Sequence, residues 1–371
     1  MVKDHPSQVQ NKNNTTPHFR VYTKHDSLYL TNIRRFETRV GERIQTIQNH
    51  DIAAVIDTVS APYVLIGIPE NIGVKANYGT GGTSSIWIPF LQSFLNTQSN
   101  DFLSGDEILL LGSFDFSDLE NLIDQMAHDD EEKIEAYRHA VNTIDEEVEK
   151  LIKLLVSHNK IPIVIGGGHN NAYPIIKGTA KGLQAAQKVP LSQINCINLD
   201  AHTDYRPSEG RHSGNAFRYA EEDGFLQKYC VIGLHENYLP QNVWMDIVNN
   251  PFIDCITFED IFIHEKRTFR QAVSHAIQFT DDGYAGIELD MDSIENVISS
   301  ALSPTGVSAI HARQYINLCA AHAAVGYLHI CEGATRLTNG TTNETTGKLI
   351  SYLVSDFIKA HSSKINLTML R

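Results

Sequence analysis

Short apolar runs recur along most of this chain, with helix-length stretches between them. Each run is nearly continuous in apolar residues, which is typical of strands buried on both faces of a parallel sheet. Strands that alternate with helices predict a three-layer α/β/α sandwich around a mostly parallel central sheet. The predicted strands span residues 63–68, 108–112, 162–165, 194–199, 229–234, 284–291 and 325–330.

The segments between these strands have their own signals. A helical region is predicted over residues 26–58, a Gly-rich loop over 73–82 and a helix over 83–95. Residues 129–155 have apolar positions at helical spacing and acidic residues at their start, which predicts a long surface helix. A polar loop over 339–348 precedes a last helix.

Length and composition bound the architecture and the partners. The 371 residues, 42% of them hydrophobic, suffice for one large core. We expect a flexible polar tail over residues 1–18 and a single α/β catalytic domain over 19–371. The net charge of −14 argues against a nucleic-acid or anionic-membrane partner, since both require a basic face. No apolar run reaches the roughly 18 residues that a membrane span needs.

The cysteines and the N-terminus bear on the compartment. The five cysteines are odd in number and form no CxxC pair, which favours free thiols in a reducing compartment. The first residues lack the apolar core of a signal peptide. We therefore expect a cytoplasmic protein.

The first segment with chemical content follows the predicted strand 162–165. Gly166, Gly167 and Gly168 come next and lead directly to His169. Such a turn can present the histidine at the end of a strand, where ligands bind in open α/β sheets. A phosphate-binding loop is the other interpretation, but no Gly-Lys-Ser/Thr follows. A surface histidine in an ordinary turn also stays open.

Two further segments place acidic residues in alternation at strand ends. Asp200, His202 and Asp204 follow one strand, and Glu288, Asp290 and Asp292 end another. Alternating residues of an extended chain project to one face. Carboxylates that converge there repel one another unless a cation compensates their charge. The alternatives are a solvated loop with chance acids for the first of these segments and an amphipathic edge strand with a wet acidic face for the second.

Together these segments offer imidazole and carboxylate donors without a thiolate. That set suits Mn²⁺, Fe²⁺, Co²⁺ or Ni²⁺, whereas a structural zinc site would more often use cysteine. Six donors exceed the need of one ion, so we predict two ions that share an activated water as the nucleophile. The donors are His169, Asp200, His202, Asp204, Asp290 and Asp292.

In these segments the sequence resembles the arginase/agmatinase/formimidoylglutamase (ureohydrolase) superfamily. The family pattern is a Gly-Gly-x-His turn, an Asp-Ala-His-x-Asp segment, a Ser-Gly-Asn loop and an Asp-x-Asp strand. All four occur here in that order, the loop at residues 213–215, over roughly residues 60–335. The resemblance implies an arginase-like fold and a hydrolase that cleaves a C–N bond of a small amidino or guanidino substrate. It also implies a manganese-type centre of two divalent ions.

The resemblance also implies a role for each donor. One ion would be bound by His169 and Asp204, the other by His202 and Asp292, and both would be bridged by Asp200 and Asp290. Glu332 matches the acid that holds the amidino or guanidino cation, a group that a carboxylate can bind in bidentate fashion. Asp204 would also relay a proton to the leaving nitrogen. The family further implies a homo-oligomer.

Departures from the arginase pattern bear on the substrate. Gly168 stands where arginases and agmatinases usually have Asp, and Phe217 where arginases have a histidine. Arg206, Arg211 and Arg218 lie in the loop expected to hold the substrate tail, and arginine clamps carboxylates. The pattern favours formimidoylglutamate, which has two carboxylates, over arginine and over other guanidino substrates. A deacetylase-like hydrolase and a non-catalytic binding protein are the alternatives. The expected substrate-binding residues are Arg206, Ser213, Asn215, Arg218, Glu288 and Glu332.

Overall fold

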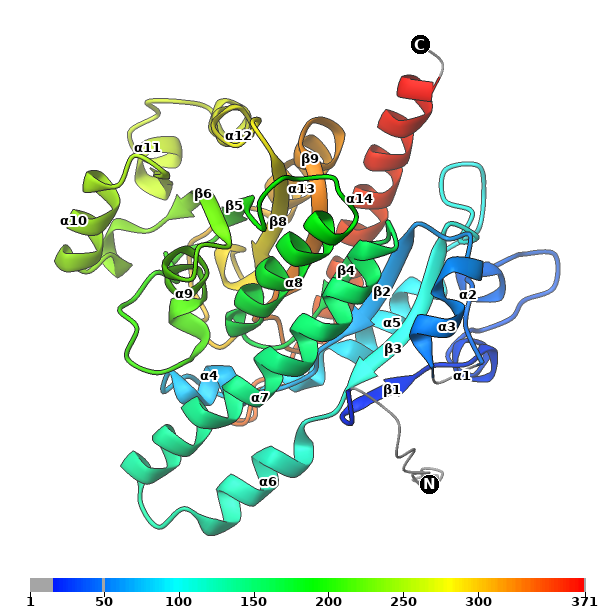
Figure 1. Cartoon of the computed structure of the whole chain (residues 1–371), viewed down its shortest axis with the longest axis horizontal. Coiled ribbons are helices and arrows are strands. Elements are labelled where there is room, and N and C mark those ends of the chain that lie inside the picture. Colours follow the sequence, from blue (N-terminus) through cyan, green and yellow to red (C-terminus); the bar gives the residue numbers. More distant parts are fainter. Residues whose placement is uncertain (1–15, 49–50, 370–371) are drawn as a thin grey trace.

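A nine-stranded sheet forms the middle layer of the computed structural model, which describes residues 16–48 and 51–369 (Figure 1). Its strand order is β1-β3-β2-β4-β9-β8-β5-β6-β7, and all neighbours are parallel except β1 and β3. The prediction of a mostly parallel central sheet is therefore confirmed. The strands are β1 (Phe19–Val21), β2 (Tyr63–Gly67), β3 (Ile108–Phe114), β4 (Ile161–Ile165), β5 (Ile194–Leu199), β6 (Leu226–Leu234), β7 (Ile253–Thr257), β8 (Tyr284–Asp290) and β9 (Ala324–Cys331).

Seven of these strands correspond to the predicted ones, and the two edge strands do not. β1 has three residues and pairs antiparallel with β3. β7 has the sequence IDCIT, in which polar residues interrupt the apolar ones. An edge strand has one neighbour and is less buried, so it lacks the continuous apolar run on which the prediction relied.

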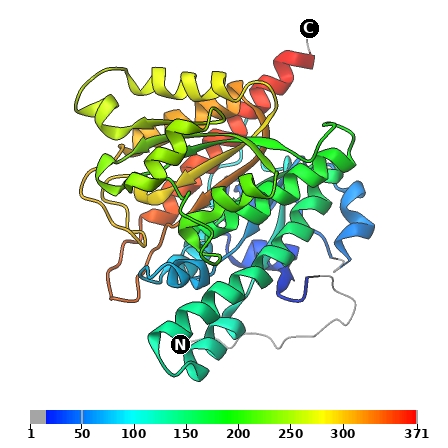
Figure 2. The same ribbon diagram turned by 60° about the vertical axis from the view of Figure 1, so that its left-hand side comes forward.

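Helices cover both faces of the sheet, as Figures 1 and 2 show. The α-helices are α1 (Lys24–Tyr29), α2 (Val40–Arg43), α3 (Ile52–Val55), α4 (Ile72–Ala76), α5 (Trp87–Phe94), α6 (Ser117–Met126), α7 (Asp130–Ser157), α8 (Ala172–Ala185), α9 (Ala216–Glu222), α10 (Gln241–Asn249), α11 (Phe258–Phe262), α12 (Phe269–Phe279), α13 (Ala309–His322) and α14 (Thr346–Met369). The 3₁₀ helices are η1 (Ile56–Thr58), η2 (Thr83–Ser85), η3 (His169–Asn171), η4 (Ser213–Asn215), η5 (Glu236–Tyr238) and η6 (Met291–Ser293).

Two apolar cores lie on opposite faces of the sheet. Along β2, Leu65 belongs to the core under α5, α12, α13 and α14, whereas its neighbours Val64 and Ile66 belong to the core under α7, α8 and α9. Successive residues of a strand point to opposite faces, so a central strand needs apolar residues at every position. This requirement explains the continuous apolar runs of the sequence.

The N-terminal region is helical, as expected over residues 26–58, but in short pieces, which are α1, α2, α3 and η1. At the start of α2, the N–H groups of Val40 and Gly41 donate to the carbonyls of Thr97 and Leu95. These tertiary hydrogen bonds replace those of a continuous helix. The predicted loop over 73–82 likewise begins later, because α4 extends to Ala76.

The flexible tail expected over residues 1–18 stays a prediction, because residues 1–15 lie outside the described part of the chain. His18 is packed against α7, with its Nδ1 2.6 Å from Oε1 of Glu147. The single domain over 19–371 stays a prediction. In the described part of the chain, no helix is both long and apolar enough to cross a membrane.

The contact between α7 and α8 depends on glycine. A Cβ at Gly178 would lie 2.8 Å from the carbonyl oxygen of Glu149 and 2.9 Å from Cβ of Ile152. Gly182, one turn further on, lies equally close to α7, since its Cβ would be 2.7 Å from Cβ of Val156. The two helices therefore pack with their backbones in close approach.

We predict that Gly178→Ala destabilises the fold although alanine is the better helix former. Alanine favours a helix by about 1 kcal/mol over glycine, but forcing a methyl group into a packed core costs about 1–3 kcal/mol. Urea unfolding should show a net loss, while Ala185→Ser at an exposed position of α8 should change stability by less than about 0.5 kcal/mol. An unchanged or increased stability of Gly178→Ala would contradict the close approach.

Candidate metal centre

The side chains singled out in the sequence meet at the carboxyl edge of four adjacent central strands. In the order β4-β9-β8-β5, each strand places its residue at its carboxyl end or in the turn that follows. His169 follows β4, Glu332 follows β9, Asp290 ends β8, and Asp200 follows β5. Because the strands are parallel, their carboxyl ends share one edge, which is where α/β sheets bind ligands.

His169 stands at the centre of a first group of donors. Its Nδ1 lies 2.7 Å from Oδ2 of Asp204 and 3.2 Å from Oδ2 of both Asp200 and Asp290. The imidazole is fully buried, and its Nδ1 makes no aligned hydrogen bond to any of these oxygens. Four lone pairs thus point toward one small region without satisfying one another.

A second group adjoins the first. Nδ1 of His202 lies 3.0 Å from Oδ2 of Asp292 and 3.7 Å from Oδ1 of Asp200. Asp200 therefore faces the first group with Oδ2 and the second with Oδ1. Within each group the donor atoms lie within 4.8 Å of one another. All six donors predicted from the sequence are brought together, and Asp200 is placed between the two groups.

The electrostatics of the cluster indicate whether it can bind cations. Burial, together with the neighbouring Asp200, raises the pKa of Asp204 to about 6, and burial with Asp292 and Asp200 raises the pKa of Asp290 well above its usual range. Oδ1 of Asp292 is buried without a hydrogen-bond partner. An excess of buried negative charge and orphaned oxygens is what divalent cations would relieve. The residues present therefore fit a metal centre.

The turn before His169 is fixed by backbone conformation and by a buried acid. Gly167 has φ of 76°, in the left-handed region that favours glycine. Glu70 is buried behind the turn, and its carboxylate accepts from the N–H of Gly168 and of Gly73 and from the Asn171 amide. A Cβ at Gly168 would lie 2.5 Å from Oδ1 of Asn170, so the aspartate usual in arginases has no room here.

Glu332 is held rigidly beside the donors. Its Oε1 accepts from the backbone N–H of His169 at 2.8 Å, and its Oε2 accepts from the Ser300 hydroxyl. Burial raises the pKa of Glu332 to about 8, and the nearby Asp204 contributes to the increase. Glu332 and Asp204 both have left-handed backbones, with φ of 60° and 44°. Such conformations are strained for residues other than glycine and concentrate at functional sites.

A cavity of about 620 Å³ opens above this cluster. His202, Asp204, Asp290, Asp292 and Glu332 form part of its lining. Across the cavity, the ring of Tyr238 stacks on the imidazole of His202 with the ring centroids 4.9 Å apart. A small molecule in the cavity can therefore reach the donors and the Glu332 carboxylate together.

Two of the expected substrate residues line the rim of this cavity. Arg206 donates to Oδ1 of Asn77 at 2.9 Å and to Oε1 of Glu209 at 2.6 Å. Ser213 lies beside them, and its hydroxyl accepts from the Asn77 amide at 3.3 Å. The rim therefore presents a cation and an anion side by side.

The structure does not bring Asn215, Arg211 or Arg218 to the cavity. The Asn215 amide is fully buried and bonds to its own loop, through Gly210, Pro207, His212 and Arg211. We therefore correct its assignment from substrate binding to loop structure.

The two arginines have partners of their own. Arg211 is buried and pairs with Asp145 of α7, donating from Nε at 2.9 Å and from Nη2 at 3.2 Å. Arg218 pairs with Asp246 and stacks over the ring of Tyr205 at 4.1 Å. Neither guanidinium has a free face toward the cavity, so only Arg206 of the three is in position to contact a substrate.

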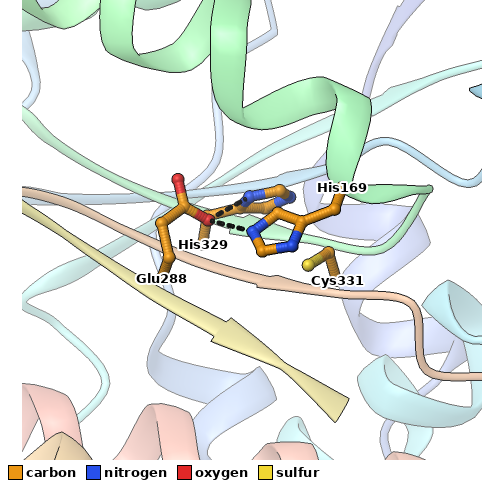
Figure 3. Close-up of side chains that lie close together, drawn as sticks. All are labelled: His169, Glu288, His329 and Cys331. Atoms are coloured by element: carbon orange, nitrogen blue, oxygen red, sulfur yellow. Dashed lines mark hydrogen bonds and ion pairs between the residues drawn. The ribbon is translucent and has the colours of Figure 1, made fainter. Parts of the chain in front are cut away.

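Glu288 is also fully buried and does not line the cavity, and Figure 3 shows its carboxylate directed at the imidazoles of His169 and His329. Its carboxylate contacts the imidazoles of His329 and His169. Burial opposes its ionisation, but these histidines lower the pKa of Glu288 to about 2. We therefore correct the expectation that Glu288 binds the substrate.

Phe217 is likewise buried, with its ring edge-on to that of His169 at 5.1 Å between the centroids. It fills space below the donors and does not line the cavity, although the sequence pattern sets it at the position of the arginase histidine.

Several neighbours of the site were not anticipated from the sequence. Asn77, Glu209, Tyr238, Ser300 and His329 contact predicted site residues. Asn77 falls in the Gly-rich segment 73–82, and that composition was a signal for a functional loop. The others stand in segments without a motif, and their roles depend on how distant loops fold together.

Comparison with known proteins agrees with the fold and the order of motifs. The family model described as the arginase family matches residues 93–357. The parallel α/β sheet with a cluster of acids and histidines at its carboxyl edge agrees with this match. Because the family model covers more than half of the sequence, the chain belongs to the arginase family.

Two relatives by sequence are named formimidoylglutamase. That of Rhodococcus jostii (strain RHA1) is 32% identical over 187 residues, 47% of this chain and 54% of the relative. That of Streptococcus pyogenes serotype M5 (strain Manfredo) is 28% identical over 183 residues, 48% of this chain and 52% of the relative. The aligned region thus spans about half the length of these curated relatives.

Solved structures share the fold over most of the chain. Formimidoylglutamase from Bacillus subtilis has a TM-score of 0.66 at 18% identity, covering 90% of this chain and 94% of that one. Formiminoglutamase from Trypanosoma cruzi, solved with Mn²⁺, has a TM-score of 0.65 at 20% identity, covering 88% of this chain and 99% of that one.

We predict that the Arg211–Asp145 pair is structural. Asp145→Asn would leave the buried guanidinium without a counter-charge, and breaking a buried pair in this way costs about 3–5 kcal/mol. Asp246→Asn removes the partner of Arg218 at a half-exposed position and should cost no more than about 1 kcal/mol. Urea unfolding of the metal-free protein measures both, and equal losses would contradict the assignment.

Proposed function

We propose that this protein is a dinuclear metal-dependent hydrolase that cleaves a C–N bond of a small amidino or guanidino substrate. The observation that carries the proposal is the convergence of six histidine and aspartate donors, four of which line a cavity together with the buried carboxylate of Glu332. His169 and Asp204 would hold one ion, His202 and Asp292 the other, and Asp200 and Asp290 both. Imidazole and carboxylate donors favour Mn²⁺, with Ni²⁺, Co²⁺ and Fe²⁺ as other suitable ions.

The chemistry divides between the ions and the chain. When bound, a pair of divalent ions lowers the pKa of water toward neutrality and stabilises developing negative charge. Glu332 accepts hydrogen bonds from the planar N–C–N group of the substrate and holds its carbon above the donors. Asp204 takes up a proton on its carboxylate and delivers it to the leaving nitrogen. The strained, fixed backbones of both residues keep these carboxylates in place.

Formimidoylglutamate is the substrate that we favour, with glutamate and formamide as products. With the amidino group at Glu332, a carboxylate of the substrate tail can reach the rim and pair with Arg206. The names of the two sequence relatives support this choice. In this pose the Glu209 side chain must turn away, because in the structure its carboxylate accepts a hydrogen bond from the Arg206 guanidinium.

Arginine is a second candidate, and the position of Glu209 favours it. An α-amino acid carries an ammonium group next to its carboxylate, and the adjacent Arg206 and Glu209 match that pair of charges. An arginase activity, or hydrolysis of another guanidino amino acid, would use the same floor of the cavity. A non-catalytic binding role would leave the proton-transfer function of Asp204 without purpose.

The cellular context completes the proposal. The free cysteines fit a reducing compartment, and we propose that the protein acts in the cytoplasm. A homo-oligomer is also part of this proposal, on the family resemblance alone. The cavity supports a small-molecule substrate, and the negative net charge argues against a nucleic-acid or anionic-membrane partner.

The metal centre predicts both stoichiometry and loss of activity. Elemental analysis after loading with Mn²⁺ should approach two ions per chain in the wild type and about one in Asp292→Asn. Asp200→Asn removes a charge shared by both groups and should lower kcat at least roughly 10²-fold. A wild type that stays at one ion, or a wild-type rate in Asp200→Asn, would contradict the dinuclear site.

The rim predicts opposite effects for its two charged residues. Arg206→Ala should raise KM for formimidoylglutamate by about 10- to 100-fold with a smaller change in kcat, because a charge-assisted hydrogen bond is lost. Glu209→Gln frees Arg206 and should lower this KM or leave it unchanged, whereas KM for arginine should rise.

The assay therefore compares both variants with both substrates. Arg218→Ala is the control, since this arginine lies outside the cavity and should leave KM unchanged. If arginine is turned over and formimidoylglutamate is not, our first choice of substrate is wrong and the second stands.

A further inference from the structure

A fully buried carboxylate lies below the proposed metal centre and has no access to a substrate. Glu288 stands on β8, directly opposite His329 of the neighbouring strand β9. Its Oε1 accepts from the Tyr327 hydroxyl at 2.7 Å, and its Oε2 lies 2.6 Å from Nδ1 of His329 and 3.4 Å from Nε2 of His169 (Figure 3). Both oxygens are therefore engaged, and Oε2 also lies within ion-pair distance of Nε2 of His169, a buried nitrogen that makes no hydrogen bond of its own.

His169 has two distinct sides. Nδ1 faces the oxygens of Asp200, Asp204 and Asp290, while Nε2 faces Glu288. A neutral imidazole that offers a lone pair on one nitrogen carries its proton on the other. Which nitrogen keeps the proton is set by the acceptor beside it, and metal-binding histidines usually donate to such an acceptor.

We propose that Glu288 is a positioning residue that fixes the orientation and the tautomer of His169. Its negative charge beside Nε2 favours the tautomer with the proton on that nitrogen and so directs the lone pair of Nδ1 into the group of aspartates. His329 and Tyr327 hold the carboxylate from the side and from below, so that it cannot rotate away. The inference rests on the proposed function, because it assigns His169 to one of the two ions.

The topology of the sheet gives this network its rigidity. His169 follows β4, His329 and Tyr327 belong to β9, and Glu288 belongs to β8. These three strands are adjacent, so main-chain hydrogen bonds fix the distances between the network members. Burying an ionised carboxylate is costly unless it is paired, and an apolar residue would serve packing alone better. A charge at this place is therefore explained by its effect on the histidine above it.

The same side chains could instead hold an ion of their own. Donor atoms of His169, Glu288, His329 and Cys331 lie within 4.8 Å of one another. We favour the positioning role because an ion there would need the nitrogen opposite the one that faces the aspartates. The alternative predicts a third ion per chain, which metal analysis can detect.

The test compares two buried substitutions around the same residue. Glu288→Gln keeps the shape but loses the negative charge that faces both imidazoles. Tyr315→Phe is the matched control: this buried tyrosine donates to the backbone carbonyl of Glu288 at 2.8 Å and does not touch the carboxylate. Both proteins are titrated with Mn²⁺, the occupancy is measured by elemental analysis, and electron paramagnetic resonance distinguishes single ions from coupled pairs.

We expect Glu288→Gln to lower the affinity for one of the two ions by about 10- to 100-fold. A single-ion spectrum should then persist at one equivalent of Mn²⁺. Tyr315→Phe should retain the coupled pair and the wild-type affinities. If Glu288→Gln does not fold, His329→Asn takes its place and should lower the affinity for the same ion by about 10-fold.

Three outcomes would overturn the inference. They are unchanged affinities in a folded Glu288→Gln or His329→Asn variant, an equal weakening of both ions, and a third ion in the wild type. A wild type that binds fewer than two Mn²⁺ would instead contradict the proposed function, and the inference with it. The wild-type titration therefore separates the two failures.

Discussion

Mutual repulsion among buried carboxylates is the constraint on which this structure depends. Asp200, Asp204, Asp290 and Asp292 meet at one sheet edge with two histidines, which are too few to neutralise them. Such a cluster is costly in an apolar interior unless cations share it. The surrounding structure keeps these groups from moving apart: each follows a central strand of the sheet, where main-chain hydrogen bonds and two apolar cores resist displacement.

A second layer of buried charges holds the loops that the strands alone do not fix. Glu70 ties the glycine turn before His169 to the segment at Gly73, and Arg211 ties the 206–215 loop to α7 through Asp145. Glu288 lies below the donors in the same supporting role. Each of these charges has a defined partner, as burial requires. The site is therefore built from charged groups at two depths, and only the upper ones reach the cavity.

This arrangement explains what the sequence could predict. The central strands and the six donors are local patterns, namely apolar runs and alternating acids at their ends, and they were identified correctly as converging groups. Alternation shows on which face a residue lies but not how deep it lies. Glu288 is two residues before Asp290, about 7 Å further into the sheet, and so it misses the cavity. Arg211 and Arg218 were misplaced because their partners, Asp145 and Asp246, are distant in sequence.

The floor and the rim of the cavity are therefore positioned by different parts of the fold. The floor is set by strand ends, whose positions the sheet fixes. The rim is set by loops, in which Arg206 is placed by Glu209 of its own loop and by Asn77, which is over a hundred residues away in the sequence. Loops tolerate substitution better than a packed sheet does. A change of charge at Glu209 can therefore redirect the preference between a dicarboxylate and a zwitterionic amino acid while the floor, and the hydrolysis proposed for it, stays the same.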